Sequence, residues 1–148
     1  MARMEVFSDE WAAACRDRLN DHGRMKSVAS SWSSPVALVM RPDSRLGVER
    51  ERVIYLELLD GVCVVSRVAD ENDRARAEFV LAADAAQWKR MLTGGLDPIP
   101  AVMLGKLKLE RGSLTALLPH ASAARELIAA ARDAGGYFPD AAGRANQA

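Results

Sequence analysis

The feature that most constrains the fold is a β-hairpin signal in the middle of the chain. Two runs rich in β-branched residues, 53–59 and 62–68, flank the dipeptide Asp60-Gly61. Asp-Gly suits the positive φ angles of a two-residue hairpin turn, and a turn of that length sets the register of the two strands. From the tip outwards, the predicted pairs are Leu59–Val62, Leu58–Cys63 and Leu56–Val65.

The two faces of this hairpin differ in character. The second face is mixed, with apolar residues such as Tyr55 and Val64 beside Glu57 and Ser66, and it is interpreted as partly exposed or covered by a partner. The first face is assigned to the core because it is apolar up to Arg67 at its open end, and it consists of Ile54, Leu56, Leu58, Cys63 and Val65.

Periodicity and capping signals predict the other elements. Gly135-Gly136 is predicted to end the terminal helix. The predicted elements are a helix over 9–21 with Ser8 as its N-cap, strands over 36–41, 75–81 and 106–110, short helices over 84–93 and 97–105, further helical turns from Ser113 and Pro119, and a terminal helix over 120–134.

This order of elements favours an α+β fold, with a five-stranded, mostly antiparallel sheet covered on one face by helices. Strands and helices do not alternate regularly, which argues against a doubly wound nucleotide-binding fold. We expect one domain over residues 1–136 and a flexible C-terminal tail over 137–148.

Charge and composition argue against several classes of protein. The formal net charge is +0, from 20 basic and 20 acidic side chains that are interleaved. A nucleic-acid partner is not expected, because such proteins cluster positive charge against phosphates. The N-terminus lacks the apolar core of a signal peptide and the C-terminal Asn146-Gln147-Ala148 is no peroxisomal address, so a cytoplasmic location is expected.

Few residues suggest chemistry. The sequence contains no glycine-rich phosphate loop. His22 and His120 are isolated, and Cys15 and Cys63 have apolar neighbours, so neither a metal site nor a disulfide framework is predicted. A catalytic triad assembled across the chain stays open at this stage, although no nucleophile lies in a recognisable signature.

The C-terminal half has an unusual concentration of large apolar residues, including Trp88, Met91 and Met103. These residues either form an ordinary core or line an adaptable cavity between short helices and the sheet. The sequence pattern leaves both interpretations open.

The segment LTGGLDPIPAVMLGKLKLERGSLTALLP, residues 92–119, resembles the signature region of the sterol carrier protein-2 (SCP2) family. The matching features are the Thr93-Gly94-Gly95 turn, the Asp97-Pro98 helix start, the Gly105-Lys106 strand start and the return to helix at Gly112-Ser113. The similarity extends over most of residues 36–131. Arg111 and Pro100 depart from the family pattern.

The resemblance implies a non-catalytic domain without a cofactor, which binds a fatty acid, fatty acyl-CoA, sterol or phospholipid in a tunnel between the sheet and the C-terminal helices. The expected headgroup contacts are Lys89, Arg90, Lys106 and Lys108. The expected ligand-lining residues are Trp88, Met91, Leu92, Ile99, Val102, Met103, Leu107, Leu109, Leu117, Leu118 and Leu127.

Three functions follow as hypotheses. The first is binding or transfer of an apolar ligand, with transient membrane contact as a further expectation. The second is a protein-interaction or homodimerisation module with a filled core, docking through the hairpin face around Tyr55 and Val64. The third, an acyl-group hydrolase or transferase, requires a nucleophile and a base that the sequence does not reveal.

Overall fold

A five-stranded sheet forms the centre of the computed structural model, which describes residues 4–21 and 32–140. Its order is β3-β2-β1-β4-β5, and all neighbours are antiparallel except β1 and β4, which run parallel. This confirms the predicted α+β class with a mostly antiparallel sheet. The strands are β1 (Pro35–Arg41), β2 (Arg52–Leu59), β3 (Val62–Val68), β4 (Phe79–Asp84) and β5 (Lys108–Arg111).

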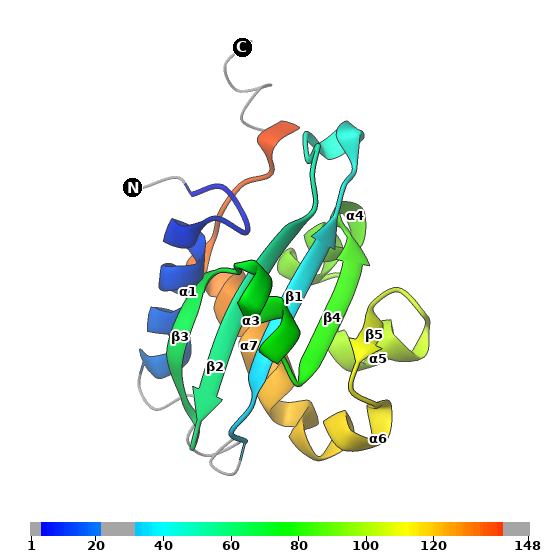
Figure 1. Ribbon diagram of the computed structural model, residues 1–148. Helices are drawn as coiled ribbons and strands as arrows, with labels where there is room; N and C mark the ends of the chain where they lie inside the picture. The colour runs from blue at the N-terminus through cyan, green and yellow to red at the C-terminus, as the bar shows by residue number, and fades with distance from the viewer. Residues whose placement is uncertain (1–3, 22–31, 141–148) are drawn as a thin grey trace.

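Most helices lie on one face of the sheet, and α3 alone crosses the other face in Figure 1. The main core fills the space between the sheet and the larger helix layer, and it includes Trp11, Trp88 and Leu127. The helices are α1 (Asp9–Asn20), α3 (Glu71–Arg76), α4 (Ala85–Leu92), α5 (Pro98–Met103), α6 (Leu114–Leu117) and α7 (Ala121–Ala134), with 3-10 turns η2 (Ser44–Leu46) and η3 (Leu118–His120).

The hairpin has the predicted turn but not the whole predicted register. Leu59 pairs with Val62 and Leu58 with Cys63, as expected. Leu56 pairs with Ser66 instead of Val65, because a bulge between Glu57 and Leu58 leaves one extra residue on β3. The bulge turns Ser66 into the buried face, where its hydroxyl donates to the carbonyl of Ala12 at 2.7 Å.

The predicted strand over 75–81 is wrong in its first half. Residues 71–76 form α3, and β4 begins only at Phe79. Asp70 and Asp73 make a reciprocal capping box, in which each carboxylate accepts a backbone N–H of the other residue. This local pairing outweighs the strand-like alternation of the following Ala and Arg residues.

Helix α3 also explains why β1 and β4 are parallel. It carries the chain from the end of β3 across the sheet face to the start of β4, so β4 runs in the same direction as β1 (Figure 1). Beneath α3 lies a small second apolar cluster that contains Ala37, Val80 and Ala77. The expectation of helices on one face only is therefore corrected at α3.

Helix α1 begins at its predicted N-cap and closes the outer edge of β3. The Ser8 hydroxyl accepts the N–H of Trp11. The Asn20 carboxamide donates to the carbonyl of Cys63 and accepts its N–H, both at 2.9 Å. These bonds occupy both backbone groups of Cys63, which an edge strand would otherwise offer to another chain.

Helix α5 accommodates Pro100 within its first turn. Pro98 and Pro100 are its first and third residues. Backbone N–H groups in the first turn of a helix have no intrahelical acceptor, so a proline there removes no helical hydrogen bond.

The chain packs beyond the expected domain boundary at residue 136. Tyr137 donates its N–H to the carbonyl of Met4 at 2.8 Å, and Val6 donates back to the carbonyl of Tyr137 at 3.0 Å. Phe138 is buried in the main core. The packed chain thus extends at least to Asp140, because two aromatic side chains follow the glycine pair; residues 141–148 lie outside the described ranges.

Candidate functional site

The residues expected to line a ligand tunnel fall into three groups. Leu92, Ile99, Val102 and Leu109 are half-buried against the main core. Met103 and Leu118 are exposed at the surface. The remaining five are fully buried: Trp88, Met91, Leu107, Leu117 and Leu127.

The five buried residues belong to the main core and line none of the four pockets described below. Trp88 is fixed by its indole N–H, which donates to the carbonyl of Val39 at 2.8 Å. Its ring also meets that of Phe7 edge-on. Trp88 therefore positions α4 on the sheet.

The four expected headgroup cations line separate pockets. Lys106 and Lys108 lie beside a polar pocket of about 230 Å³ together with Arg41 and Asp84. Lys89 and Arg90 lie on α4, beside a pocket of about 510 Å³. Only Lys89 also contacts a predominantly apolar pocket, which we call the terminal pocket.

The terminal pocket lies between α4, the end of α7 and the two chain ends. Its volume is about 220 Å³. Its lining includes the apolar side chains of Val6, Leu92 and Phe138 and the cationic side chains of Lys89 and Arg132.

The two cations of the terminal pocket are held by different contacts. The Lys89 ammonium lies 5.8 Å from the centre of the Phe138 ring, within range of a cation–π interaction. Arg132 donates through Nη2 to the carbonyl of Met91 at 3.0 Å, while its buried Nε has no hydrogen-bond partner among the described residues. A buried donor without an acceptor costs free energy.

Three of the residues that build the terminal pocket were missed by sequence reasoning. Val6 lies near the start of the described chain and Phe138 near its end. Arg132 lies in the last turn of α7. The available signal was the Tyr137-Phe138 pair directly after a glycine stop, since aromatic side chains are uncommon in a free tail.

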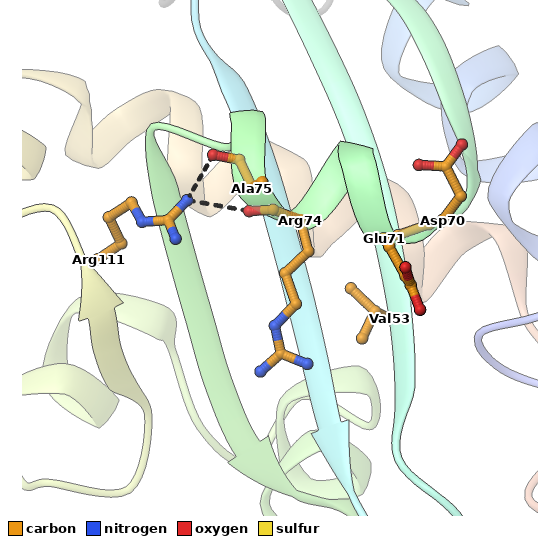
Figure 2. Close-up of a pocket in the computed structure, with 7 residues that line it drawn as sticks. Val53, Asp70, Glu71, Arg74, Ala75 and Arg111 are labelled. Atoms are coloured by element: carbon orange, nitrogen blue, oxygen red, sulfur yellow. Dashed lines mark hydrogen bonds between the residues drawn. The ribbon is translucent and has the colours of Figure 1, made fainter.

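A second, more charged pocket lies on the α3 face of the sheet and has a volume of about 450 Å³. Figure 2 shows Arg111 reaching from β5 to the end of α3, where Nη1 donates to the carbonyls of Arg74 and Ala75. Arg74 is ion-paired with Glu51 and Glu110. Because four of its seven lining residues are charged, this pocket suits an apolar ligand less well than the terminal pocket does.

The same face contains a buried ion cluster. Asp73 has no exposed surface and accepts from Arg67 at 2.7 and 3.1 Å and from Arg76 at 2.7 Å. The Arg67 hydrogen bonds are the main reason that the pKa of the Asp73 carboxyl lies far below its ordinary value. Both guanidinium groups also lie over the ring of Tyr55, at 5.6 and 5.4 Å.

Tyr55 is therefore buried beneath this cluster and offers no surface to a partner. The docking face considered around Tyr55 and Val64 is corrected accordingly, although Val64 itself is exposed. The sequence signal for the cluster was weak, because the acidic turn before Arg74 is typical of a solvated loop.

Neither cysteine is an activated nucleophile, and the described residues contain no cluster that could hold a metal ion. Cys15 and Cys63 are free and buried, and burial raises the pKa of both thiols to about 12, so they are protonated at neutral pH. His120 stacks on Trp32 at 4.9 Å; His22 lies outside the described residues. No group of three metal-ligating side chains and no helix able to span a bilayer occurs within residues 4–21 and 32–140.

The five-stranded sheet and the helix layer on one of its faces define a small α+β protein. The chain belongs to the SCP-2 sterol transfer family, whose model matches residues 36–116. This confirms the resemblance found in residues 92–119.

Solved structures agree with this membership. The conserved hypothetical protein TT1886 of Thermus thermophilus, described as possibly a sterol carrier protein, is 36% identical, with a TM-score of 0.79 and coverage of 92% of this chain and 94% of that one. A crystal structure of sterol carrier protein 2 is also 36% identical, with a TM-score of 0.78 and coverage of 87% and 98%.

Sterol carrier protein 2 of Yarrowia lipolytica in its apo form shares the fold at 18% identity and a TM-score of 0.54, with coverage of 82% of this chain and 88% of that one. None of the curated proteins compared with the sequence matches it.

Proposed function

We propose that this protein binds a lipid with an apolar chain and an anionic head, without catalysis, and that the terminal pocket holds the head and the first part of the chain. The observation that carries this proposal is an apolar pocket whose lining includes the cationic side chains of Lys89 and Arg132. Membership of a sterol transfer family supports lipid binding in general.

The cations favour one class of lipid over another. The names of the relatives point to sterols, whose only polar group is an uncharged hydroxyl. Two cationic side chains beside an apolar wall match a carboxylate or phosphate better, because hydrogen bonds to an ionised acceptor are stronger than neutral ones. We therefore place fatty acids ahead of sterols as ligands.

The size of the pocket sets how a long chain would bind. A volume of about 220 Å³ is smaller than the roughly 300–1,000 Å³ of pockets for drug-sized ligands. Leu92 borders the pocket and also packs against the main core, so a longer chain extends past Leu92 by displacing side chains there. Each methylene buried in this way contributes about 0.8 kcal/mol.

Titration with a fluorescent fatty acid tests this proposal. We expect Lys89→Gln to weaken binding about tenfold, which corresponds to the loss of one charge-assisted contact, and Leu92→Asn to weaken it at least as much. Arg90→Gln is the matched control, because Arg90 is the next residue on α4 and does not border the terminal pocket. Its affinity should equal that of the wild type.

Competition experiments identify the ligand class. Unlabelled palmitate should displace the probe at lower concentration than cholesterol. Equal effects of Lys89→Gln and Arg90→Gln would contradict the assignment of the site, and displacement by cholesterol alone would contradict the anionic head. Native mass spectrometry of the purified protein should show a co-purified fatty acid.

A further inference from the structure

Two adjacent apolar side chains project from the C-terminal end of α5, just before the connection to β5. Met103 is 71% exposed and Leu104 is 65% exposed, the highest values among the large apolar residues that the structure describes. Figure 1 shows this connection extending from the β5 side of the molecule. We call these two residues the α5 tip.

The backbone of the α5 tip is internally hydrogen-bonded. Leu104 donates its N–H to the carbonyl of Pro100 at 2.9 Å, and Lys106 donates to that of Ala101 at 2.8 Å. Gly105 makes the turn with a φ of +74°, and a side chain at that position would meet no atom within 4 Å. The turn can therefore enter an apolar phase without exposing unsatisfied N–H groups, which is a requirement for contact with lipid.

Positive charge lies directly beside the α5 tip. Lys106 and Lys108 border the polar pocket of about 230 Å³, together with Arg41 and a single acidic residue, Asp84. Within the described ranges, neither lysine has an ion-pair partner: the carboxylate of the nearby Glu110 is engaged by arginine. An unpaired pair of lysines next to exposed apolar side chains is complementary to an anionic membrane surface.

We propose that the α5 tip docks the protein on an anionic phospholipid bilayer, with Met103 and Leu104 entering the headgroup–acyl boundary and Lys106 and Lys108 contacting phosphate groups. This inference deepens the proposed function, since it names the donor or acceptor surface from which a lipid carrier would load. It does not depend on which lipid occupies the terminal pocket.

The other prominent apolar surface lacks this charge pattern. Leu59 and Val64 on the hairpin are 53% and 49% exposed, and the turn between their strands contains Asp60 rather than a lysine. The hairpin is therefore not complementary to an anionic surface. It provides a matched control with comparable apolar exposure.

Vesicle co-sedimentation of the full chain tests the proposal, with phosphatidylcholine vesicles that contain or lack phosphatidylglycerol. We expect wild-type protein to partition onto the anionic vesicles and to be released by salt. The tip variant Met103→Ser/Leu104→Ser should lose at least about tenfold in partition coefficient. The charge variant Lys106→Gln/Lys108→Gln should lose about thirtyfold. The hairpin variant Leu59→Ser/Val64→Ser should bind like the wild type.

An environment-sensitive fluorophore on Leu104→Cys gives a second measurement. Its emission should shift to the blue with anionic vesicles, while the same label on Leu59→Cys should not respond. Labelling is selective, because the two native cysteines are buried. Circular dichroism confirms that each variant is folded.

The results separate the two proposals. No wild-type binding to anionic vesicles, equal loss in the tip and hairpin variants, or binding that is insensitive to the lysines would overturn docking by the α5 tip. Fatty-acid binding measured without vesicles reports on the terminal pocket alone, and the tip variants should leave it unchanged. A wild-type protein that binds vesicles but no fatty acid would contradict the proposed function and leave the docking surface intact.

Discussion

At the scale of single residues, Asp73 is the charged side chain that the fold buries completely within the described ranges. Its carboxylate receives hydrogen bonds from two arginines and from the N–H of Asp70. It fixes the first turn of α3 and attaches that helix to β3. A polar group in this position specifies one arrangement of α3, because any other arrangement would leave a buried charge unpaired.

Replacing Asp73 with asparagine should destabilise the protein by about 2 kcal/mol, since charge-assisted hydrogen bonds to two arginines are lost at a buried site. Urea unfolding at neutral pH measures this loss. Glu71→Gln, an exposed change in the same helix, should stay within about 0.5 kcal/mol of the wild type. Similar stabilities of the two variants would show that the cluster contributes little.

The contribution of Asp73 should also depend on pH. An aspartate in the unfolded chain titrates near pH 3.8, and the folded protein holds the pKa of Asp73 well below that value. The stabilisation is therefore complete above about pH 5 and is lost as the pH falls below about 4, where the unfolded chain takes up the proton first. The stability difference between the wild type and Asp73→Asn should shrink over that acidic range and stay constant from about pH 5 to 8. A difference that is unchanged at low pH would contradict the low pKa.

At the scale of elements, α3 is tied to the opposite edge of the sheet by Arg111 of β5. The guanidinium Nη1 donates to three carbonyls at and just beyond the end of the helix, those of Arg74, Ala75 and Ala77. These are groups that a six-residue helix cannot satisfy by itself. Arg111 is one of the two departures from the family pattern, and the structure gives it this structural role.

Arg111→Ala should therefore loosen α3 more than it affects the rest of the fold. We expect a loss of about 1–2 kcal/mol in unfolding free energy and faster hydrogen exchange at the amides of residues 74–77. Arg125→Ala, a change at an exposed arginine of α7, provides the control. Uniform acceleration of exchange across the sheet would instead indicate that Arg111 acts on global stability.

The elements show where sequence reasoning succeeds and where it fails. Asp60-Gly61 and Ser8 were identified correctly because each acts within a few residues of the chain. Helix α3 was missed because the alternation over 75–81 imitates a strand, and only the reciprocal bonds of Asp70 and Asp73 decide against it. The bulge on β3 is accompanied by a tertiary contact with α1, the hydrogen bond from Ser66 to Ala12, which no local pattern specifies.

At the scale of the whole molecule, the C-terminal segment packs on the turn after η2. A Cβ at Gly47 would lie 2.7 Å from the Cβ of Pro139 and 2.9 Å from the backbone N of Asp140. Gly105 has the same φ of +74°, but a Cβ at that position would meet no atom within 4 Å. Alanine substitutions at the two glycines therefore separate two contributions to the free energy of unfolding. One is the cost of a left-handed backbone, and the other is the cost of displacing the C-terminal segment.

Gly105→Ala should cost about 1 kcal/mol through its left-handed backbone alone. Gly47→Ala should cost at least about 2 kcal/mol more, because it also pushes Pro139 away. Thermal unfolding of both variants measures the difference, and Gly47→Ala/Pro139→Gly should recover part of it. Equal losses in the two single variants would mean that the chain end does not pack there.

The candidate site was predicted only in part, because several of its residues meet only in the tertiary fold. Lys89 and Leu92 lie on a helix whose pattern was recognised, and both border the terminal pocket. Met103 is apolar and close to them in sequence, yet the end of α5 turns it to solvent. Val6, Arg132 and Phe138 meet only because the tertiary fold brings the two ends of the chain together, which no spacing within one segment encodes.

This meeting of the chain ends has a consequence for biosynthesis. The walls of the terminal pocket include Val6 and Phe138, which lie far apart in the sequence. Domains generally fold as units during synthesis, but this pocket cannot form before Phe138 has left the ribosome. Until that point, Val6 and Leu92 lack the aromatic side chain that completes the apolar wall.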